Sequence, residues 1–476
     1  MTAATTLSPA TTRPAPARHI FFALAASALL MASIDSTIVA VAIPQLTTAL
    51  SSPLALVAWT LTAYQLVQVV MLPLAGKLSD SLGRKKVFLF CVGMFTFGSL
   101  LCGLAPTIWF LIAARALQAV GGGGLMPSAV GLVSDQYRER RAQAIGLFAS
   151  VFPIGGILGP NLGGLILQHW TWREMFFINL PIGIVSLLGV AILLPKDALR
   201  QARHIDIPGV ALYAGAIVLL LATMTGVADD PDLWRNPLVW VAVIASGALF
   251  VAFLRYLKRA KDPIMEYALV VHQPFLNTNL YNLVYGAAVF GFTSFIPAYA
   301  VSRYGMNAFQ SGAVMTPRGL AMVLSSIVAS MWIIRLGYRL PMLVGMGLVA
   351  LALLLLGIAP TSLQLGSVTI DGFWIIAGIL AIGGLGTGLS APASNNAALD
   401  LAPQHAAALT GIRSTFRLTG GALSISAIVL ALTFFDDRGR GLSVAFECLA
   451  LVVVLAMFIA WTIPDAARDR ARVNAD

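Results

Sequence analysis

Charge is scarce in this sequence. Only 11% of its 476 residues are Asp, Glu, Lys or Arg, whereas 58% are hydrophobic. Together with a mean hydropathy of +0.86, this composition excludes an ordinary soluble domain and indicates a polytopic membrane protein.

Cysteines and metal-binding patterns are scarce as well. The three cysteines, Cys91, Cys102 and Cys448, all fall in apolar runs, and no C-x-x-C pair or Cys/His spacing occurs. We therefore expect neither a disulfide framework nor a metal site. The H-E-x-x-H and G-x-S-x-G signatures are also absent, which argues against a membrane-embedded enzyme.

The sequence is instead rich in long apolar runs. About fourteen stretches of roughly 20 residues, each long enough to cross ~30 Å of hydrocarbon, follow one another along the chain. They predict an all-α polytopic membrane protein with fourteen transmembrane helices. Because this number is even, both ends of the chain should lie on one side of the membrane.

The basic residues predict which side that is. Twenty-one of the 30 lysines and arginines lie in the tails and in loops on the same side, five lie on the opposite side, and four lie within spans. Basic loops are retained in the cytoplasm, so residues 1–18 and 465–476 are expected to be cytoplasmic tails. The net charge of +10 follows from this topology, and no nucleic-acid partner is expected.

Two ionisable residues fall within apolar spans at a similar depth. Asp35 lies in the first span and Arg115 in the fourth. At 1.5 Å per residue, both lie roughly 10 to 14 Å below the outer boundary, so they are candidates to pair. A lone charge in hydrocarbon costs at least ~2.5–3.5 kcal/mol, which makes such residues functional candidates. The alternative is a structural ion pair that only fixes how the helices are arranged.

The segments around these residues resemble a known family. The runs I-D-S-T-I-V-A-V-A-I-P from Ile34, W-T-L-T-A-Y-Q-L from Trp59, R-A-L-Q-A-V-G-G-G from Arg115 and W-R-E-M-F-F-I-N-L-P from Trp172 occur in the order expected for fourteen-span drug:proton antiporters of the major facilitator superfamily. The triplet at Pro317 to Gly319 adds to the resemblance, which covers nearly the whole chain.

This resemblance implies the major facilitator fold. Two six-helix bundles, residues 19–197 and 263–464, would flank two inserted linker helices in residues 198–262. A faint internal repeat agrees, because L-G-R-K-K from Leu82 has an echo in L-G-Y-R-L from Leu336. Transporters built from such repeats bind their substrates near the midplane, between the two halves.

The stretch G-K-L-S-D-S-L-G-R-K-K resembles the superfamily's motif between spans two and three. Gly76 and Gly83 permit a tight turn, and Asp80 can pair with Arg84 or accept backbone donors from a neighbouring helix. By resemblance, these four residues belong to a latch that closes the cytoplasmic side in the outward-facing state. A solvated loop that serves only topology is the alternative.

The stretch G-G-I-L-G-P-N-L-G-G resembles the antiporter motif of span five. Gly155, Gly159 and Gly163 recur at every fourth residue and allow another helix to approach closely, while Pro160 can bend the helix. By resemblance, this segment is expected to pack against the other half of the molecule and to suppress leak. Static helix contacts would need the same pattern.

Candidate substrate contacts are polar residues at helical spacing on apolar spans. They are Tyr64 and Gln68 in span two, Asn282 and Tyr285 in span nine, and Asn395 and Asn396 in span twelve. Each set could face a central cavity that receives small lipophilic substrates. Interhelical hydrogen bonding is the alternative.

Span thirteen carries Arg413 and Arg417 one helical turn apart, so two like charges share a face. Arg417 is expected to contact substrate, and Asp400 could form an ion pair with Arg413 in a cytoplasmic gate. Snorkelling of Arg413 to the inner headgroups is the alternative. With Arg115 and Arg318 also in spans, the interior is neutral to positive, which favours anionic or neutral substrates over dications.

These patterns predict a secondary transporter rather than an enzyme. The expected activity is proton-coupled efflux of lipophilic drugs or toxic small molecules across a bacterial cytoplasmic (inner) membrane by alternating access. Hydration changes as the halves rock would switch the protonation of Asp35, the expected proton carrier, with Arg115 tuning and sensing it.

Partners and alternatives follow from the same prediction. The proton gradient takes the place of a cofactor, and membrane lipid and a periplasmic adaptor protein are further expected partners. A lipid or fatty-acid flippase or a metabolite exporter on the same fold stays open, and the span-five motif argues against an importer.

Overall fold

The computed structural model describes residues 15–137, 144–145, 147–148, 150–194, 206–365, 368–402 and 406–465. Within these ranges, fourteen helices are long and apolar enough to cross a membrane, which confirms the predicted polytopic class. Most of the expected tails, and the basic loops at 138–141 and 196–203, lie outside the described residues. The first helix already begins at Ala15, inside the segment expected to be a tail.

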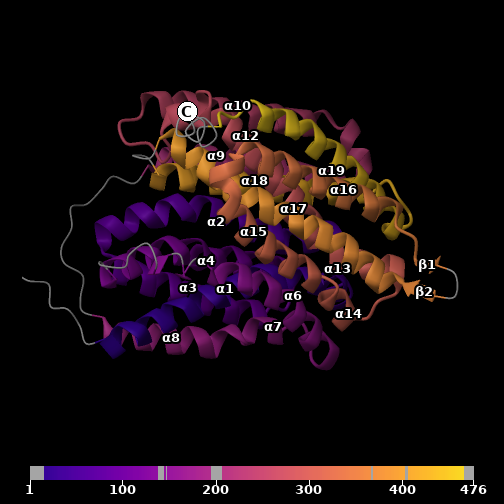
Figure 1. The fold of residues 1–476 in the computed structure, drawn as a ribbon, viewed down its shortest axis with the longest axis horizontal. Coiled ribbons are helices and arrows are strands. Elements are labelled where there is room, and N and C mark those ends of the chain that lie inside the picture. Colours follow the sequence, from indigo (N-terminus) through magenta and orange to yellow (C-terminus); the bar gives the residue numbers. More distant parts are fainter. Residues whose placement is uncertain are drawn as a thin grey trace, which may run out of the picture.

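The first six spans form the N-terminal half, and the sixth is divided into a short and a long helix. In chain order the helices are α1 (Ala15–Ala49), α2 (Leu54–Leu82), α3 (Arg84–Gly103), α4 (Ile108–Gln136), α6 (Val151–His169), α7 (Glu174–Phe177) and α8 (Asn179–Leu193). Figure 1 shows this half, coloured indigo to magenta, below the C-terminal half.

Two inserted spans follow. They are α9 (Ile207–Asp229) and α10 (Pro237–Arg259), joined by a 3-10 turn, η2 (Pro231–Arg235). Asp206 caps α9 by accepting from the Gly209 backbone N–H at 2.9 Å, and it also accepts from the Tyr256 hydroxyl at 2.7 Å and the Ile264 N–H at 2.8 Å. One side chain thus holds both helices and the following loop together.

The remaining spans form the C-terminal half. Its elements are α11 (Tyr267–Val271), α12 (Phe275–Gly286), the π-helix η3 (Ala287–Gly291), α13 (Phe292–Tyr304), α14 (Ala308–Ala313), α15 (Thr316–Leu336), α16 (Arg339–Ile358), β1 (Ser362–Leu365), β2 (Val368–Asp371), α17 (Gly372–Leu401), α18 (Ala406–Leu432) and α19 (Arg438–Trp461). Span nine is therefore interrupted at its centre by the π-helix.

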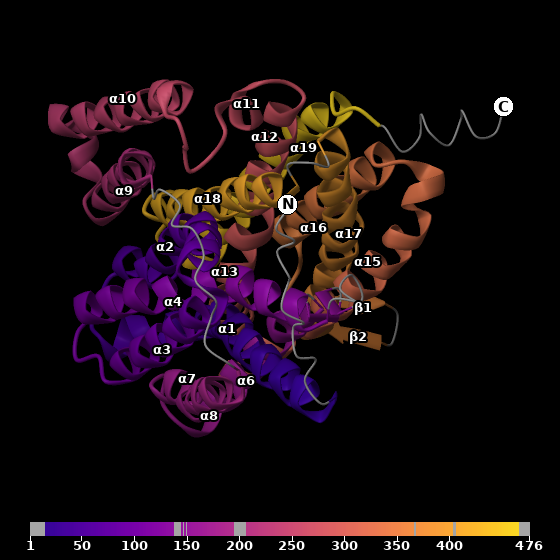
Figure 2. The same cartoon turned by 90° about the vertical axis from the view of Figure 1, so that its left-hand side faces the viewer.

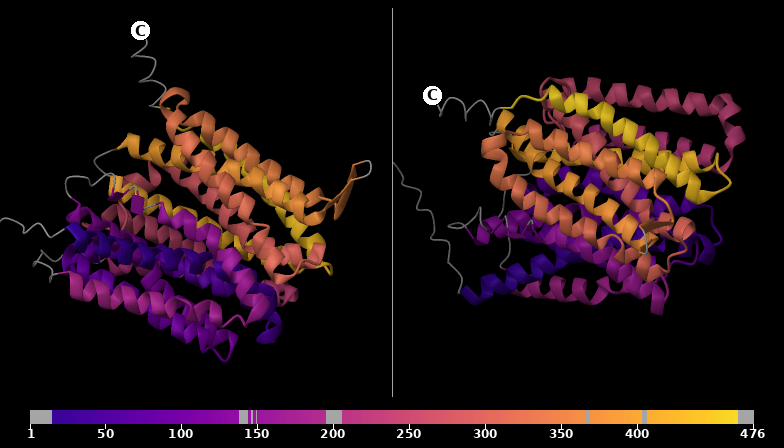
Figure 3. Two further views of the ribbon diagram at one scale, coloured as in Figure 1. Left: turned by 60° about the horizontal axis from the view of Figure 1, so that its bottom comes forward. Right: turned by 45° about the vertical axis from the view of Figure 1, so that its right-hand side comes forward.

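The strands β1 and β2 were not predicted. They pair antiparallel, with Ser362 opposite Asp371 and Leu365 opposite Val368, and the hairpin projects from one end of the molecule (Figure 3). Its segment alternates apolar and polar residues, which is the usual strand signal, but it is short and lies between two long apolar runs. The hairpin and α14 lie at the same end, which the predicted topology makes the outer end (Figure 1).

Glycines with positive φ separate helices at equivalent places in the two halves. Gly83, φ 104°, lies between α2 and α3, and Gly337, φ 75°, lies between α15 and α16. Side chains other than glycine rarely adopt such angles. The faint sequence repeat around these two glycines therefore corresponds to a repeated turn in the structure.

The two halves meet through three groups of helices. α1 contacts α13, α6 contacts α14 and α15, and α2 contacts α18. Among the described residues, α4 and α17 make no comparably extensive contact with the opposite half. α9 covers the seam between α2 and α18 from outside (Figure 2). Trp59 Nε1 of α2 donates to Thr225 Oγ1 of α9, and the Tyr213 hydroxyl of α9 is hydrogen-bonded to Thr419 of α18 at 2.7 Å. The linker pair is thus attached to both halves.

Candidate functional site

The centre of the N-terminal half holds a fully buried ion pair. Arg115 Nη1 of α4 lies 2.6 Å from Asp35 Oδ2 of α1, and neither side chain is exposed. Burying a charge is costly unless it is paired and hydrogen-bonded, and removing one partner leaves the other uncompensated. The structure therefore brings together the two residues that depth alone had made candidates.

Two amide side chains complete the surroundings of Asp35. Its Oδ1 accepts from Gln118 Nε2 at 2.9 Å and from Asn179 Nδ2 at 3.1 Å. The same two amides also donate to Ser99 Oγ of α3, at 2.7 and 3.2 Å. Because every one of these partners of the carboxylate is a donor, the arrangement fits an ionised Asp35.

Arg115 also contacts groups of α2 and of its own helix, α4. Its Nε donates to the Thr60 carbonyl of α2 at 3.1 Å, and its Nη1 also reaches Gln118 Oε1. The guanidinium carbon lies 4.0 Å from the centre of the Tyr64 ring, a cation–π geometry. Tyr64 is 2% exposed, so this expected substrate contact lies instead within the ion-pair cluster.

Sequence reasoning missed Gln118, Asn179, Ser99 and Thr60. A signal for Gln118 was available, because it lies three residues after Arg115 and therefore on the same helix face. Asn179 lies within the W-R-E-M-F-F-I-N-L-P segment that carried part of the family resemblance. Nothing in the sequence pattern assigned either amide to Asp35.

The glycine face of α6 lies against α1. A Cβ at Gly155 would come within 2.5 Å of the Ser33 side chain, one at Gly159 would overlap the Thr37 hydroxyl, and one at Gly163 would lie 2.9 Å from Ile38. These three glycines support the turns of α1 on either side of Asp35. The contact expected between this segment and the other half involves other residues of α6.

A different edge of α6 reaches the C-terminal half. A Cβ at Gly312 of α14 would overlap the Pro160 carbonyl oxygen, and a Cβ at Gly164 would lie 2.7 Å from the Ala308 carbonyl oxygen. Asn161 Oδ1 accepts from Thr316 Oγ1 of α15 at 2.8 Å. α6 is therefore a direct physical connection between the Asp35 segment and α14 and α15.

The residues of the expected latch are partly placed. Arg84 Nη1 donates to the Gly131 carbonyl of α4 at 2.7 Å, which ties the start of α3 to α4. The side chain of Asp80 lies outside the described residues. A Cβ at Gly76 would meet nothing within 4 Å, so close helix contact does not require glycine there.

In the C-terminal half, Arg413 is surrounded by neutral acceptors. Its Nη1 donates to Asn395 Oδ1, and its Nη2 reaches Asn282 Oδ1 at 3.3 Å and Ser394 Oγ at 3.2 Å. The structure does not bring Asp400 to this arginine, because Asp400 accepts from the Tyr338 hydroxyl at 2.5 Å. Asn282 and Asn395, expected as substrate contacts, thus hold Arg413 in place.

The other residues expected to contact substrate differ in how far they are buried. Gln68 and Asn396 are half-buried. Tyr285 is buried, and its hydroxyl donates to the Thr387 carbonyl at 3.3 Å.

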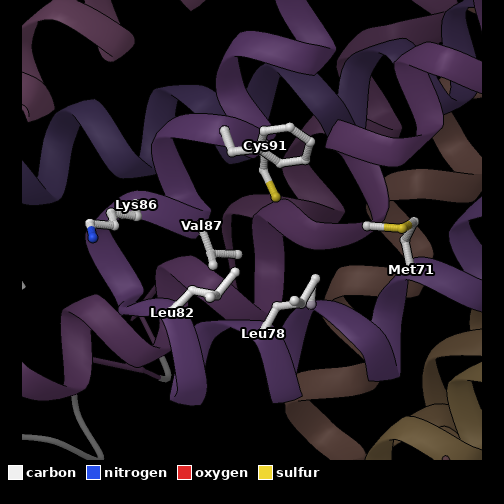
Figure 4. A pocket seen from close by; sticks show the side chains of 8 residues that line it. Met71, Leu78, Leu82, Lys86, Val87 and Cys91 are labelled. Carbon is white, nitrogen blue, oxygen red and sulfur yellow. The ribbon is translucent and has the colours of Figure 1, made fainter. Parts of the chain in front are cut away.

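An apolar cavity of about 380 Å³ lies between α2 and α3 (Figure 4). Its lining residues are Met71, Ala75, Leu78, Leu82, Lys86, Val87, Phe90 and Cys91. It shares no residue with the ion-pair cluster or with the arginines of the C-terminal half. The polar sites described above are therefore separate from this cavity.

The family model of the Major Facilitator Superfamily matches residues 25–425. The chain belongs to the Major Facilitator Superfamily. The structure and the family together confirm the predicted fold, and they indicate a transporter with many membrane spans rather than an enzyme.

Curated relatives of this transporter carry resistance names. It is 31% identical over 405 residues to the multidrug transporter protein MdtP of Bacillus subtilis, covering 84% of this chain and 73% of that protein. It is 29% identical to the methylenomycin A resistance protein of Streptomyces coelicolor, covering 94% and 93%, and 28% identical to the puromycin resistance protein pur8 of Streptomyces alboniger, covering 96% and 93%.

Solved structures share the fold of this transporter. A POT family transporter in complex with 5-aminolevulinic acid has a TM-score of 0.69 at 14% identity, covering 94% of this chain and 96% of that one. The human organic anion transporter MFSD10 (TETRAN) has a TM-score of 0.61 at 15% identity, covering 94% and 100%. At these identities the likeness concerns the fold alone.

Proposed function

We propose that this transporter exports lipophilic drugs or other toxic small molecules across the bacterial cytoplasmic membrane in exchange for protons, with both termini on the cytoplasmic side. The observation that carries the proposal is the fully buried pair of Asp35 and Arg115, joined at 2.6 Å. The multidrug and antibiotic resistance names of its relatives support drug export.

Asp35 is the proton carrier in this proposal. Protonation of the oxygen that faces Arg115 would place an O–H against a guanidinium, which cannot accept a hydrogen bond. The pair must then separate, and a neutral Asp35 no longer compensates the charge of Arg115. Proton binding is therefore linked to a rearrangement of α1 relative to α4.

α6 carries this rearrangement to the other half. It contacts the Asp35 turns of α1 through Gly155 and Gly159, and it contacts α14 and α15 through Pro160 and Asn161. A shift of α1 would therefore change how the halves meet near the outer ends of these helices. Alternating access follows if this contact opens when the transporter releases substrate and Asp35 takes up its proton from outside.

The experiment is gradient-driven transport. Purified protein is reconstituted in proteoliposomes, and its orientation is determined by protease protection. An inward-directed or outward-directed pH gradient is then imposed, and the movement of a lipophilic fluorescent probe is followed. Antiport predicts probe accumulation against the proton flux, and collapse of accumulation by a protonophore. Probe movement in the same direction as the protons, or accumulation that ignores the gradient, would overturn the proposal.

A further inference from the structure

Two arginines of the C-terminal half lack the partners that the other intramembrane arginines have. Arg318 of α15 and Arg417 of α18 each have a buried Nε atom without a hydrogen-bond partner, as Arg413 does, but unlike Arg413 neither guanidinium donates a hydrogen bond to any of the described residues. In the part of the chain that the structure describes, neither forms an ion pair with a carboxylate. Arg115 has Asp35, and Arg413 has Asn282, Asn395 and Ser394.

Tyr285 of α12 lies between the two arginines. It directly precedes Gly286, where a Cβ would overlap the Arg417 carbonyl oxygen, and its hydroxyl donates to the Thr387 carbonyl of α17, about one turn from Gly384, which lies against Arg318. Arg318 lies near the start of α15 but well inside the tenth span, which begins at Ala308, and Arg417 lies about midway along α18. Three helices thus bring two cations and a phenol together near the middle of the membrane.

Close helix contacts fix the backbone positions of both arginines. A Cβ at Gly286 of α12 would overlap the Arg417 carbonyl oxygen, and a Cβ at Gly384 of α17 would overlap the carbonyl oxygen of Arg318. Because glycine alone permits these approaches, the two side chains project from positions that the neighbouring helices hold. Such preorganisation lowers the cost of binding a ligand between them.

An anion satisfies both groups. A guanidinium presents several N–H donors in a planar fork that matches a carboxylate, sulfonate or phosphonate. The Tyr285 hydroxyl already donates its one proton to the Thr387 carbonyl, so the two guanidinium groups supply the donors. The Phe292 ring, whose centre lies 5.7 Å from the Arg318 guanidinium carbon, offers an aromatic surface beside them. The ligand that fits is therefore amphiphilic, with an anionic group and an apolar body.

We propose that Arg318, Arg417 and Tyr285 form a binding site for the anionic group of a lipophilic organic acid that the transporter carries. This inference rests on the proposed export function and names its substrate class. Arg413 is outside the site, because its fork is occupied by neutral side chains of the protein.

The test is a binding measurement that requires no transport. The purified full-length protein in nanodiscs of zwitterionic lipid is titrated with a 4-alkylbenzoate and with the matching 4-alkylbenzamide. Wild type, Arg318→Gln and Arg417→Gln are compared with Arg259→Gln, which removes an exposed charge at the end of α10. Unchanged benzamide affinity reports that each variant is folded.

The wild type should bind the benzoate roughly 10- to 100-fold more tightly than the benzamide, as expected for hydrogen bonds to charged groups. Arg318→Gln and Arg417→Gln should each remove most of this preference, while Arg259→Gln keeps it. Equal affinity of the wild type for acid and amide would overturn the proposal, as would a preference that survives both substitutions.

A second arm separates substrate from lipid. In nanodiscs that contain anionic lipid, benzoate binding should persist; if the lipid displaces the benzoate through Arg318 and Arg417, the site belongs to a lipid phosphate and the substrate assignment fails. The export function is judged independently by gradient-driven transport of the benzamide. A protein that binds the acid as predicted but exports neither probe would refute the proposed function alone.

Discussion

Gly159 of α6 lies directly against Thr37 of α1, two residues beyond Asp35. A Cβ at Gly159 would overlap the Thr37 hydroxyl and lie 2.8 Å from the Ile34 carbonyl oxygen. The glycine is thus required by the close approach of the two helices at the turn that carries the buried carboxylate. A structural role for the span-five motif follows, and it is local to Asp35.

The substitution Gly159→Ala tests this contact. It should push α1 away from α6 at a cost of about 1–3 kcal/mol and lower gradient-driven transport by displacing Asp35 from Arg115. Gly156→Ala is the matched control, because a Cβ at Gly156 meets nothing within 4 Å. Transport per folded protein in proteoliposomes is the measurement. Equal losses in both variants would show that the Gly159 contact has no special part in coupling.

Asn179 should influence the pH dependence of transport. Its amide donates to Asp35 Oδ1 at 3.1 Å, and a donor favours the charged carboxylate. Asn179→Ala removes that donor from the buried carboxylate, so the pH profile of transport should differ from that of the wild type.

The control for Asn179 is Ser186→Ala on the same helix. Ser186 is buried, but it bonds Ser27 and the Leu24 carbonyl rather than Asp35. Its pH profile should match the wild type. An unchanged profile for Asn179→Ala, measured at constant pH gradient, would argue that Asn179 only supports the fold.

The sequence predicted the fold and part of the site because those features are local. Hydropathy marks each span by itself, and counting residues from the membrane boundary was enough to suggest that Asp35 and Arg115 meet. Gln118 was within reach of the same reasoning through helix periodicity. The contact of Asn179 with Asp35 joins residues from different helices, and no periodicity within one segment reveals it.

The helix faces that meet were not predictable for a related reason. Gly155, Gly159 and Gly163 indicate a close helix neighbour but do not identify it. Their neighbour is α1, while the same segment contacts the other half through Pro160 and Asn161. Asn282 and Asn395 are polar residues in apolar spans, which indicates a polar partner without identifying it. In the structure that partner is Arg413, from a third helix. Which helices become neighbours depends on the tertiary arrangement, which one sequence does not state.

The turn at Gly83 gives a prediction about stability. Its φ of 104° is strained for any residue with a Cβ, so Gly83→Ala should cost about 1–3 kcal/mol. Gly76→Ala, inside α2 and in open space, should be neutral or slightly stabilising because alanine favours the helix. The midpoint of thermal denaturation in detergent distinguishes the two. A similar midpoint for both variants would mean that the turn relaxes without strain.

Arg413 is expected to matter for folding rather than for coupling. Arg413→Lys keeps the charge but loses the fork that reaches Asn282, Asn395 and Ser394, so stability should fall by about 1.5–3 kcal/mol. Arg440→Lys, on an exposed residue at the start of α19, is the control. For Arg413→Lys, the ratio of transport with the gradient to transport without it should stay at the wild-type value. A changed ratio in the folded Arg413→Lys protein would place this arginine in the coupling mechanism.

Asp35 is proposed to exchange its proton for substrate. This exchange is measured by adding substrate to purified protein in weakly buffered solution and following proton release with a pH indicator dye. Substrate binding to the proton-loaded wild type should release protons, whereas Asp35→Asn should release none although substrate still binds. Equal proton release by both proteins would contradict this exchange and assign the proton to another group.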